Sequence, residues 1–125
     1  MGDIMHIVYC GDAAYVPMIG ISMTSVVWNN LDSRIVFHLL VDDLRQRDAV
    51  RLQAFGRLYR NVAGIRVHRI DGGRPEMKVF RQLDSSYPES VNYRLLLPEL
   101  LEDTVERVLY LDGDVICRGS IRTLW

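Results

Sequence analysis

Short apolar runs alternate along this chain with longer segments whose apolar residues recur at helical spacing. Near-continuous apolar runs at residues 4–10 and 34–43 predict strands that are buried on both faces. Looser alternation at 64–71 predicts a third strand, and VERVLYLDGDVIC at 105–117 predicts a fourth. Helical spacing at 15–30 and 44–58 predicts a helix after each of the first two strands. This order favours right-handed crossovers and an α/β fold, with a mostly parallel sheet and helices on both faces.

The stretch between the third and fourth strands is less regular. Residues 72–88 contain two glycines and two prolines, which predicts a loop with at most a short irregular element. Residues 90–101, SVNYRLLLPELL, have a helical pattern that Pro98 should kink or break. After the fourth strand, Ser120 is a candidate cap for a short helix that holds Leu124 and Trp125. With no linker or repeat in 125 residues, we expect one domain spanning 1–125.

Composition excludes several classes of protein. The net charge is −1, so no overall basic field recruits nucleic acid. No apolar run is long enough to cross a bilayer, and the first residues do not form a signal peptide. Cys10 and Cys117 form no CxxC pair and fit a reduced cytosol. Lys78 is the only lysine; the arginine excess reflects either codon bias or anionic ligands such as phosphates.

Two aspartates, Asp112 and Asp114, follow the buried run VLYL near the end of the predicted fourth strand. Side chains two apart on an extended segment point to the same side, with alpha carbons roughly 6.5–7 Å apart. Both carboxylates can then reach one cation, and oxygen ligands select a hard ion, Mg²⁺ or Mn²⁺. Such an ion can bridge a diphosphate and stabilise it as a leaving group. Gly113, between them, is expected to let a ligand approach closely.

We interpret the other strand-end aspartates and the histidines as structural residues and not as site residues. Asp42, Asp43 and Asp71 also end predicted strands, and we interpret them as solvated strand ends. The three histidines lie inside predicted strands rather than at their carboxyl ends, which favours core or edge positions over metal ligation: His6, His38 and His68.

Two enzyme families place a DxD motif after a hydrophobic strand. Phosphatases of the haloacid-dehalogenase type carry it on their first strand, with the first aspartate as nucleophile, whereas here it follows the last of four. The chain resembles the N-terminal half of a family 8 glycosyltransferase in four blocks that keep the family's order. These blocks are HIVYCGDAAYVPMIGISMTSVVWNN, IVFHLLVDDL, YRLLLPELL and ERVLYLDGDVICRGSIRTLW.

The resemblance implies a GT-A, Rossmann-like fold and a UDP-sugar donor, UDP-glucose or UDP-galactose. It also implies Mn²⁺ (or Mg²⁺) dependence, retention of anomeric configuration, and transfer of a hexose to a glycan or lipopolysaccharide acceptor. By position, Asp112 and Asp114 match the metal-binding DxD, Asp12 matches a uracil contact, Tyr15 matches a stacking aromatic, and Arg94 matches an arginine near the donor's sugar and phosphate. No residue is assigned as catalytic.

This sequence departs from the family pattern in three ways. Ala14 replaces a frequent polar contact to the nucleotide, and Asn92 stands where relatives place a tyrosine. The family's third metal ligand, a histidine, and a phosphate-contacting lysine belong to a segment beyond Trp125. We therefore expect the chain to be truncated and incomplete for catalysis.

Several expectations concern partners and location. Ile121, Leu124 and Trp125 would be exposed by truncation and would favour a homo-oligomer. A non-catalytic, metal-dependent binder of UDP or a UDP-sugar stays open as an alternative, as does a DxD phosphatase or phosphotransferase. We expect a cytoplasmic location, with contact at the periphery of the inner membrane left open.

Overall fold

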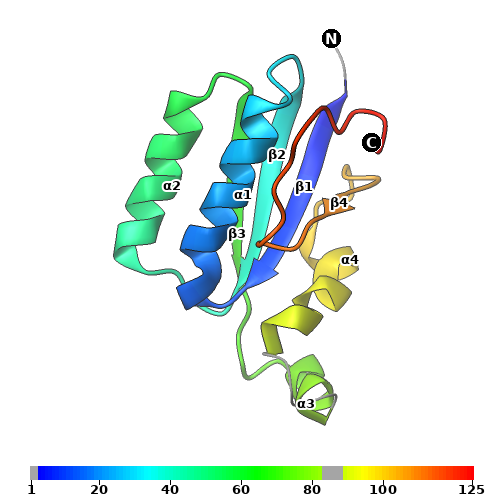
Figure 1. Cartoon of the computed structure of the whole chain (residues 1–125). Helices are drawn as coiled ribbons and strands as arrows, with labels where there is room; N and C mark the ends of the chain where they lie inside the picture. The colour runs from blue at the N-terminus through cyan, green and yellow to red at the C-terminus, as the bar shows by residue number, and fades with distance from the viewer. Residues whose placement is uncertain (1–2, 83–88) are drawn as a thin grey trace.

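The computed structural model describes residues 3–82 and 89–125, which form a parallel four-stranded sheet of order β3-β2-β1-β4 (Figure 1). Every neighbouring pair of strands is parallel, so the predicted mostly parallel sheet is confirmed. The strands are β1 (Ile4–Gly11), β2 (Arg34–Val41), β3 (Val62–Arg69) and β4 (Leu109–Tyr110).

Helices cover both faces of the sheet, as the alternating pattern predicted. One face carries α1 (Val16–Trp28) and α2 (Gln46–Leu58), and a short 3₁₀ turn, η1 (Ala13–Tyr15), precedes α1. The other face carries α3 (Pro75–Gln82), the 3₁₀ helix η2 (Glu89–Leu96) and α4 (Leu97–Leu100). In Figure 1, α1 and α2 lie side by side as parallel neighbours.

Strand alternation divides the core into two clusters. Met5, Ile7 and Tyr9 of β1 lie in the cluster beneath α1 and α2. Val8 and Cys10 lie in the cluster on the opposite face, with residues of α3, η2 and α4. Since β1 and β2 contribute to both clusters, their near-continuous apolar sequences follow from burial on both sides.

The fourth strand is much shorter than the predicted 105–117. β4 pairs with β1 at only two positions, Ile7 with Leu109 and Val8 with Tyr110. One more hydrogen bond, from the Leu111 amide to the Val8 carbonyl at 3.0 Å, extends this pairing. The chain then turns, and the Val115 amide donates to the Asp112 carbonyl at 3.2 Å. The DxD motif therefore lies in a turn and not on an extended strand.

The predicted loop at 72–88 was wrong over half its length, because α3 occupies residues 75–82. Pro75 is the first helical residue, where its fixed φ suits the helix and its missing amide hydrogen costs nothing. Residues 83–88 of that predicted loop lie outside the described part of the chain.

The predicted helix over 90–101 is instead the 3₁₀ helix η2 followed by the short α4. Pro98 does not break a helix; it lies in the first turn of α4, where proline is tolerated. The helix expected after Ser120 is a single turn, in which the Ser120 hydroxyl accepts a hydrogen bond from the Arg122 amide at 3.3 Å.

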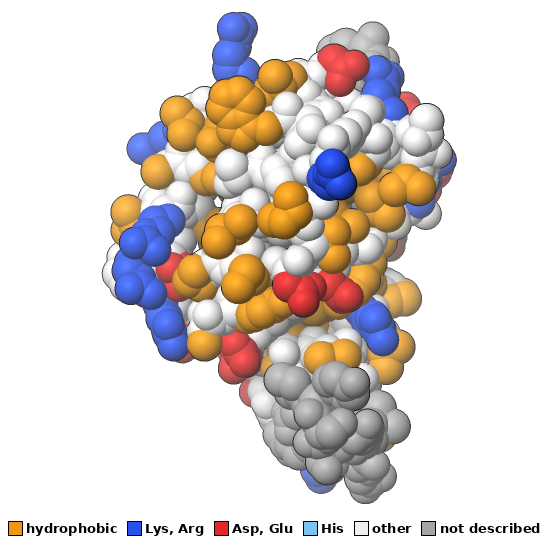
Figure 2. Space-filling view, in the orientation of Figure 1, with side chains coloured by type: hydrophobic (Ala, Val, Ile, Leu, Met, Phe, Trp, Pro, Cys, Tyr) orange, Lys and Arg blue, Asp and Glu red, His pale blue; other side chains and the backbone are white. Residues whose placement is uncertain are grey.

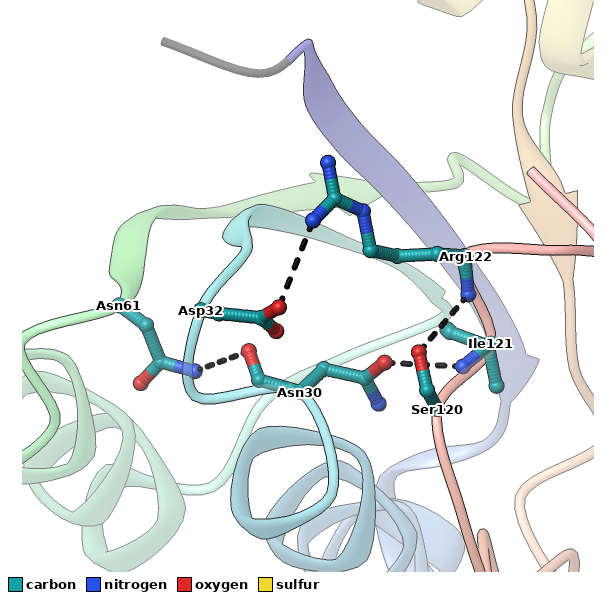
Figure 3. A network of polar contacts seen from close by, with 6 residues as sticks. All are labelled: Asn30, Asp32, Asn61, Ser120, Ile121 and Arg122. Carbon is teal, nitrogen blue, oxygen red and sulfur yellow. Dashed lines mark hydrogen bonds and ion pairs between the residues drawn. The ribbon is translucent and has the colours of Figure 1, made fainter.

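The C-terminal segment is fastened to the loop between α1 and β2 through Asn30, which is fully buried (Figure 3). The Asn30 side-chain oxygen accepts from the Ile121 amide at 2.9 Å, and its backbone carbonyl accepts from the Asn61 side chain at 3.0 Å. Arg122 forms an ion pair with Asp32 at 3.4 Å. The segment thus bridges the ends of α1, β2 and β3.

This attachment corrects the expected exposure of the C-terminal residues. Ile121 is buried, and Trp125 is partly buried with the Arg107 guanidinium 4.7 Å from its ring centre. Leu124 alone of the three residues is strongly exposed, at 70%. Among the residues that the structure describes, no helix has the length and apolar character to cross a membrane.

Candidate functional site

A cavity of about 420 Å³ opens at the carboxyl ends of β1 and β4, the edge where parallel α/β sheets bind ligands. It brings together all five residues that the sequence singled out. Its lining consists of Cys10, Gly11, Asp12, Tyr15, Ser90, Val91, Arg94, Tyr110, Asp112, Gly113 and Asp114. Segments around residues 12, 92 and 112 therefore meet at one place, although they are far apart in the sequence.

Asp112 and Asp114 both line this cavity, and both are exposed to solvent. Among the side chains that the structure describes, at residues 3–79 and 90–125, no arginine, lysine or histidine forms an ion pair with either carboxylate. Their negative charge is thus available to a cation, and their oxygens suit Mg²⁺ or Mn²⁺. The same-side arrangement inferred for a strand is achieved here by a turn.

The described residues supply no third protein ligand at this point. Among the described side chains, at residues 3–79 and 90–125, no group of three or more His, Cys, Asp or Glu has the arrangement of a metal site. The two carboxylates fit an open site, in which phosphate oxygens and water complete the shell of about six ligands.

Tyr15 is held in place by the turn that follows β1. The Asp12 carboxylate caps η1 by accepting a hydrogen bond from the Tyr15 amide at 2.9 Å. The Asp42 carboxylate accepts from the Ala13 amide at 2.9 Å, so the end of β2 braces the same turn. Burial, and then the charges of Asp114 and Asp112, raise the pKa of the Tyr15 phenol. The ring therefore stays neutral beside the two carboxylates.

Gly113 is buried and is packed against Tyr15 and Ile19. A Cβ built on Gly113 would lie 2.6 Å from Cε1 of Tyr15 and 2.8 Å from Cγ1 of Ile19. This glycine therefore makes room for two side chains of the chain itself. It also lines the cavity, and close approach of a ligand to it stays a prediction.

Tyr110 is a site residue that sequence reasoning missed. Its ring lies under the Arg94 guanidinium, with 5.5 Å between the ring centre and Cζ. Burial, followed by the neighbouring Cys10 and Asp112, raises the pKa of Tyr110 to about 12. The phenol therefore stays protonated beside Asp112, and its ring supports Arg94. Its position two residues before Asp112 was the available signal.

Cys10 and Ser90 also line the cavity without having been predicted. Burial raises the pKa of the Cys10 thiol to about 12, so this cysteine is a protonated core residue and not a nucleophile. Ser90 is buried at the start of η2.

The three other strand-end acids lie outside the cavity, as interpreted. Besides bracing Ala13, Asp42 accepts a hydrogen bond from the Asp43 amide at 2.7 Å. Asp43 accepts from the Leu44 amide at 2.8 Å, and Asp71 from the Gly73 amide at 2.8 Å. These carboxylates stabilise local turns.

The histidines form a row across β1, β2 and β3, away from the cavity. Nδ1 of His6 lies 3.0 Å from Nε2 of His38, and Nδ1 of His38 lies 3.3 Å from Nε2 of His68. His38, in the middle, is 1% exposed. His6 and His68 are partly buried on either side of it, so the interpretation of the three as core or edge residues is confirmed.

Two departures from the family pattern can also be placed. Tyr93 is 4% exposed and belongs to the core cluster under η2, so it does not reach the cavity in place of a tyrosine at position 92. Ala14 is exposed in η1 and does not line the cavity.

Residues 6–125 match the sequence profile described as Glycosyl transferase family 8. A lipopolysaccharide 1,3-galactosyltransferase of Salmonella typhimurium is 30% identical over 98% of this chain and 35% of its own length. A lipopolysaccharide 1,2-glucosyltransferase of Escherichia coli K12 is 28% identical over the same two shares. The chain thus spans about a third of the length of these curated relatives.

Among solved structures, the galactosyltransferase LgtC, crystallised with donor and acceptor sugar analogues, superposes with a TM-score of 0.79. It is 27% identical to this chain, and the match covers 97% of this chain and 42% of that one. The predicted GT-A-type α/β fold is therefore confirmed.

Proposed function

Because the chain belongs to glycosyl transferase family 8, we propose that its cavity binds a UDP-sugar, UDP-glucose or UDP-galactose. The corresponding activity is metal-dependent transfer of the hexose to a glycan or lipopolysaccharide-type acceptor, with retention of configuration. The observation that carries the proposal is the shared cavity of Asp12, Tyr15, Arg94, Asp112 and Asp114. The relatives that act on lipopolysaccharide and the LgtC complex support the choice of donor and acceptor.

The diphosphate would lie against the DxD turn. Asp112 and Asp114 would hold Mn²⁺ or Mg²⁺, which neutralises a bound diphosphate and stabilises it as a leaving group. Tyr110 lies beside Asp112 and supports the Arg94 guanidinium through its ring. Arg94 is thereby directed at the cavity with its donors available for phosphate or sugar oxygens.

The uracil would lie at the other end of the cavity, against Tyr15. An aromatic face suits a base because every base presents a π-face for stacking. Asp12 uses one carboxylate oxygen to cap the Tyr15 amide, and a carboxylate has further lone pairs to accept the N–H of a pyrimidine. The same residue thus orients the stacking ring and reads the base.

Two other functions differ in what they require. A DxD phosphatase needs Asp112 as a nucleophile after the first strand of its sheet, whereas here the motif follows the fourth strand of a family 8 chain. A non-catalytic UDP binder needs the same cavity and differs only in lacking turnover. By family membership we propose a cytoplasmic location with contact at the inner membrane.

Calorimetric titration with a set of ligands in the presence of Mn²⁺ tests the proposed donor. UDP should bind more tightly than ADP and than inorganic pyrophosphate, because only UDP offers both the diphosphate and the pyrimidine. Equal affinities for UDP, ADP and pyrophosphate would contradict base recognition. Hydrolysis of p-nitrophenyl phosphate that disappears in Asp112→Asn, without UDP binding, would replace the proposal by the phosphatase.

A further inference from the structure

The outer surface of the α1–α2 layer exposes large apolar side chains on helices that belong to a folded core. α1 contains no charged residue, although one side of it faces solvent. The exposed apolar residues on the two helices are Met18 at 44%, Ile21 at 56%, Trp28 at 61%, Val50 at 55% and Leu58 at 69%. We call the surface formed by these residues and the arginines of residues 45–60 the α1–α2 face.

The charge on this face has one sign. Residues 45–60 contain a single acid, Asp48, which is buried, and five exposed arginines: Arg45, Arg47, Arg51, Arg57 and Arg60. Residues 16–28 carry no charge, so the two segments together have a net charge of +4. The whole chain has a net charge of −1, so the remaining residues have a net charge of −5. The positive charge is therefore concentrated on one side of the molecule.

The apolar and basic residues lie on neighbouring helices of one layer. Trp28, at the end of α1, contacts Tyr59, just beyond α2, edge to face with ring centres 6.2 Å apart. Arg57, Leu58 and Arg60 therefore belong to the same corner as Trp28. Figure 2 shows hydrophobic side chains distributed over α1, and basic side chains along the margin where α2 lies.

We infer that the α1–α2 face docks on an anionic lipid surface. Arginines near an anionic leaflet are attracted to it, and interleaved apolar side chains insert into the boundary between headgroups and acyl chains. Trp28 has the amphipathic ring that is enriched at this boundary. A second copy of the chain fits less well, because a two-fold contact places the same arginine-rich patch on both sides.

This inference rests on the charge and exposure of α1 and α2, and it does not depend on what the cavity at the DxD turn binds. It gives the proposed membrane contact a defined surface. The face is formed by helices that lie beside the sheet, whereas the cavity opens at the carboxyl ends of β1 and β4. A docked molecule therefore keeps its cavity open to a second ligand.

Flotation with lipid vesicles tests the docking directly. The 125-residue protein should float with vesicles that contain phosphatidylglycerol and not with vesicles of phosphatidylcholine alone, and binding should weaken as salt is raised. Arg57→Gln and Arg60→Gln should each lower the partition coefficient by about fivefold, as expected for one basic residue near an anionic leaflet. Both arginines are preferable to Arg47 and Arg51, which contact Asp48 at 3.7 and 3.9 Å.

Matched controls lie on the opposite face of the sheet. Lys78→Gln removes one exposed positive charge from α3, and Val79→Ser removes an apolar side chain that is 57% exposed. Neither should change vesicle binding by more than about twofold, which is well below the effect of one basic residue at an anionic leaflet. Trp28→Ser should weaken binding, and the Trp28 emission, identified by its loss in Trp28→Phe, should shift to the blue on vesicles.

Three results would overturn the inference, each with far-UV circular dichroism confirming that the variants are folded. One is no binding, or equal binding to both kinds of vesicle. Another is an equal loss in Lys78→Gln and Arg57→Gln, which would indicate a non-specific effect of net charge. The third is a dimer in light scattering that Trp28→Ser dissolves, without vesicle binding, which would assign the face to a second copy. UDP titration of the same samples reports separately on the donor site.

Discussion

One edge of the Tyr15 ring packs against two glycines, Gly11 at the end of β1 and Gly113 in the middle of the DxD motif. A Cβ on Gly11 would lie 3.0 Å from Cδ1 of Tyr15, and a Cβ on Gly113 would lie 2.6 Å from Cε1 of the same ring. No glycine in the described part of the chain has a positive φ, so these positions are constrained by space and not by backbone conformation. The proposed stacking residue and the proposed metal motif are thus packed against each other.

Gly113→Ala should therefore destabilise the protein by about 1–3 kcal/mol, the usual cost of overpacking a filled site. Urea unfolding measures this directly. Gly119→Ala is the matched control, because no atom lies within 4 Å of a Cβ at that position. The cost of Gly113→Ala should also be smaller in a Tyr15→Ala background. An unchanged cost would mean that Tyr15 does not occupy that space.

Tyr15→Ala should weaken UDP binding by about 1–3 kcal/mol, the range for aromatic–base stacks. Its effect on inorganic pyrophosphate should be small, since stacking acts on the base. Tyr15→Phe keeps the ring and should retain most of the affinity for UDP. Titration of both ligands into both variants gives the four values needed. Parallel losses for UDP and pyrophosphate in Tyr15→Ala would assign the residue to the fold alone.

Asn30→Ala should lower the free energy of unfolding by about 1–3 kcal/mol, because it leaves the buried Ile121 amide without its acceptor. The same change removes the hydrogen bond from the Asn30 side chain to the Val26 carbonyl at 2.8 Å. Protease digestion of the folded protein should show earlier cleavage within residues 115–125. Asn29→Ala removes a second attachment of the same segment, the hydrogen bond from the Asn29 side chain to the Cys117 carbonyl at 3.0 Å. If Asn30→Ala is cleaved at the wild-type rate, the buried Asn30 side chain does not hold this segment.

Stability should fall as the pH is lowered through the row of histidines. Burial, followed by the charges of His6, His68 and Arg66, lowers the pKa of His38 to about 4, and burial also lowers the pKa values of His6 and His68. The unfolded chain then binds more protons than the folded one below about pH 6.5. The neutral row stabilises the fold above that pH, and the stabilisation is lost as the pH falls toward 4.

For His38 alone, this linkage amounts to about 2 kcal/mol lost between pH 7.5 and pH 5. Urea unfolding at the two pH values gives the difference, and His38→Leu should reduce it because the leucine does not titrate. A pH dependence of unfolding that is the same in His38→Leu would show that other groups are responsible.

The parts of this fold that could be predicted are those that follow from the spacing of apolar residues along the sequence. β1 and β2 are apolar on both faces, and α1 and α2 follow them at helical spacing, so type and order could be recognised from residues alone. Asp112 and Asp114 were predicted from their spacing after a buried run, whereas Asp12, Tyr15 and Arg94 came from a family resemblance. The fold brings all five together. Periodicity alone would have left Tyr15 and Arg94 as ordinary helix residues.

The wrong predictions concern features that depend on the three-dimensional structure and not on local sequence pattern. β4 is short because the chain turns after Leu111 to place Gly113 against Tyr15, a contact between residues about a hundred positions apart. Pro75 and Pro98 were treated as breakers, although each lies in the first turn of a helix, where proline is favoured. Ile121 was expected to be exposed by truncation, whereas its amide is held by Asn30, a contact between residues distant in the sequence.

The most direct test of the central claim is the dependence of UDP binding on a divalent ion at Asp112 and Asp114. Calorimetry in Mn²⁺ and in EDTA should show UDP binding that is lost on chelation. Asp112→Asn and Asp114→Asn should each abolish the metal-dependent part, whereas Asp103→Asn, an exposed acid outside the cavity, should not. Equal UDP affinity in Mn²⁺ and EDTA, or metal-dependent binding that survives both DxD substitutions, would contradict the account.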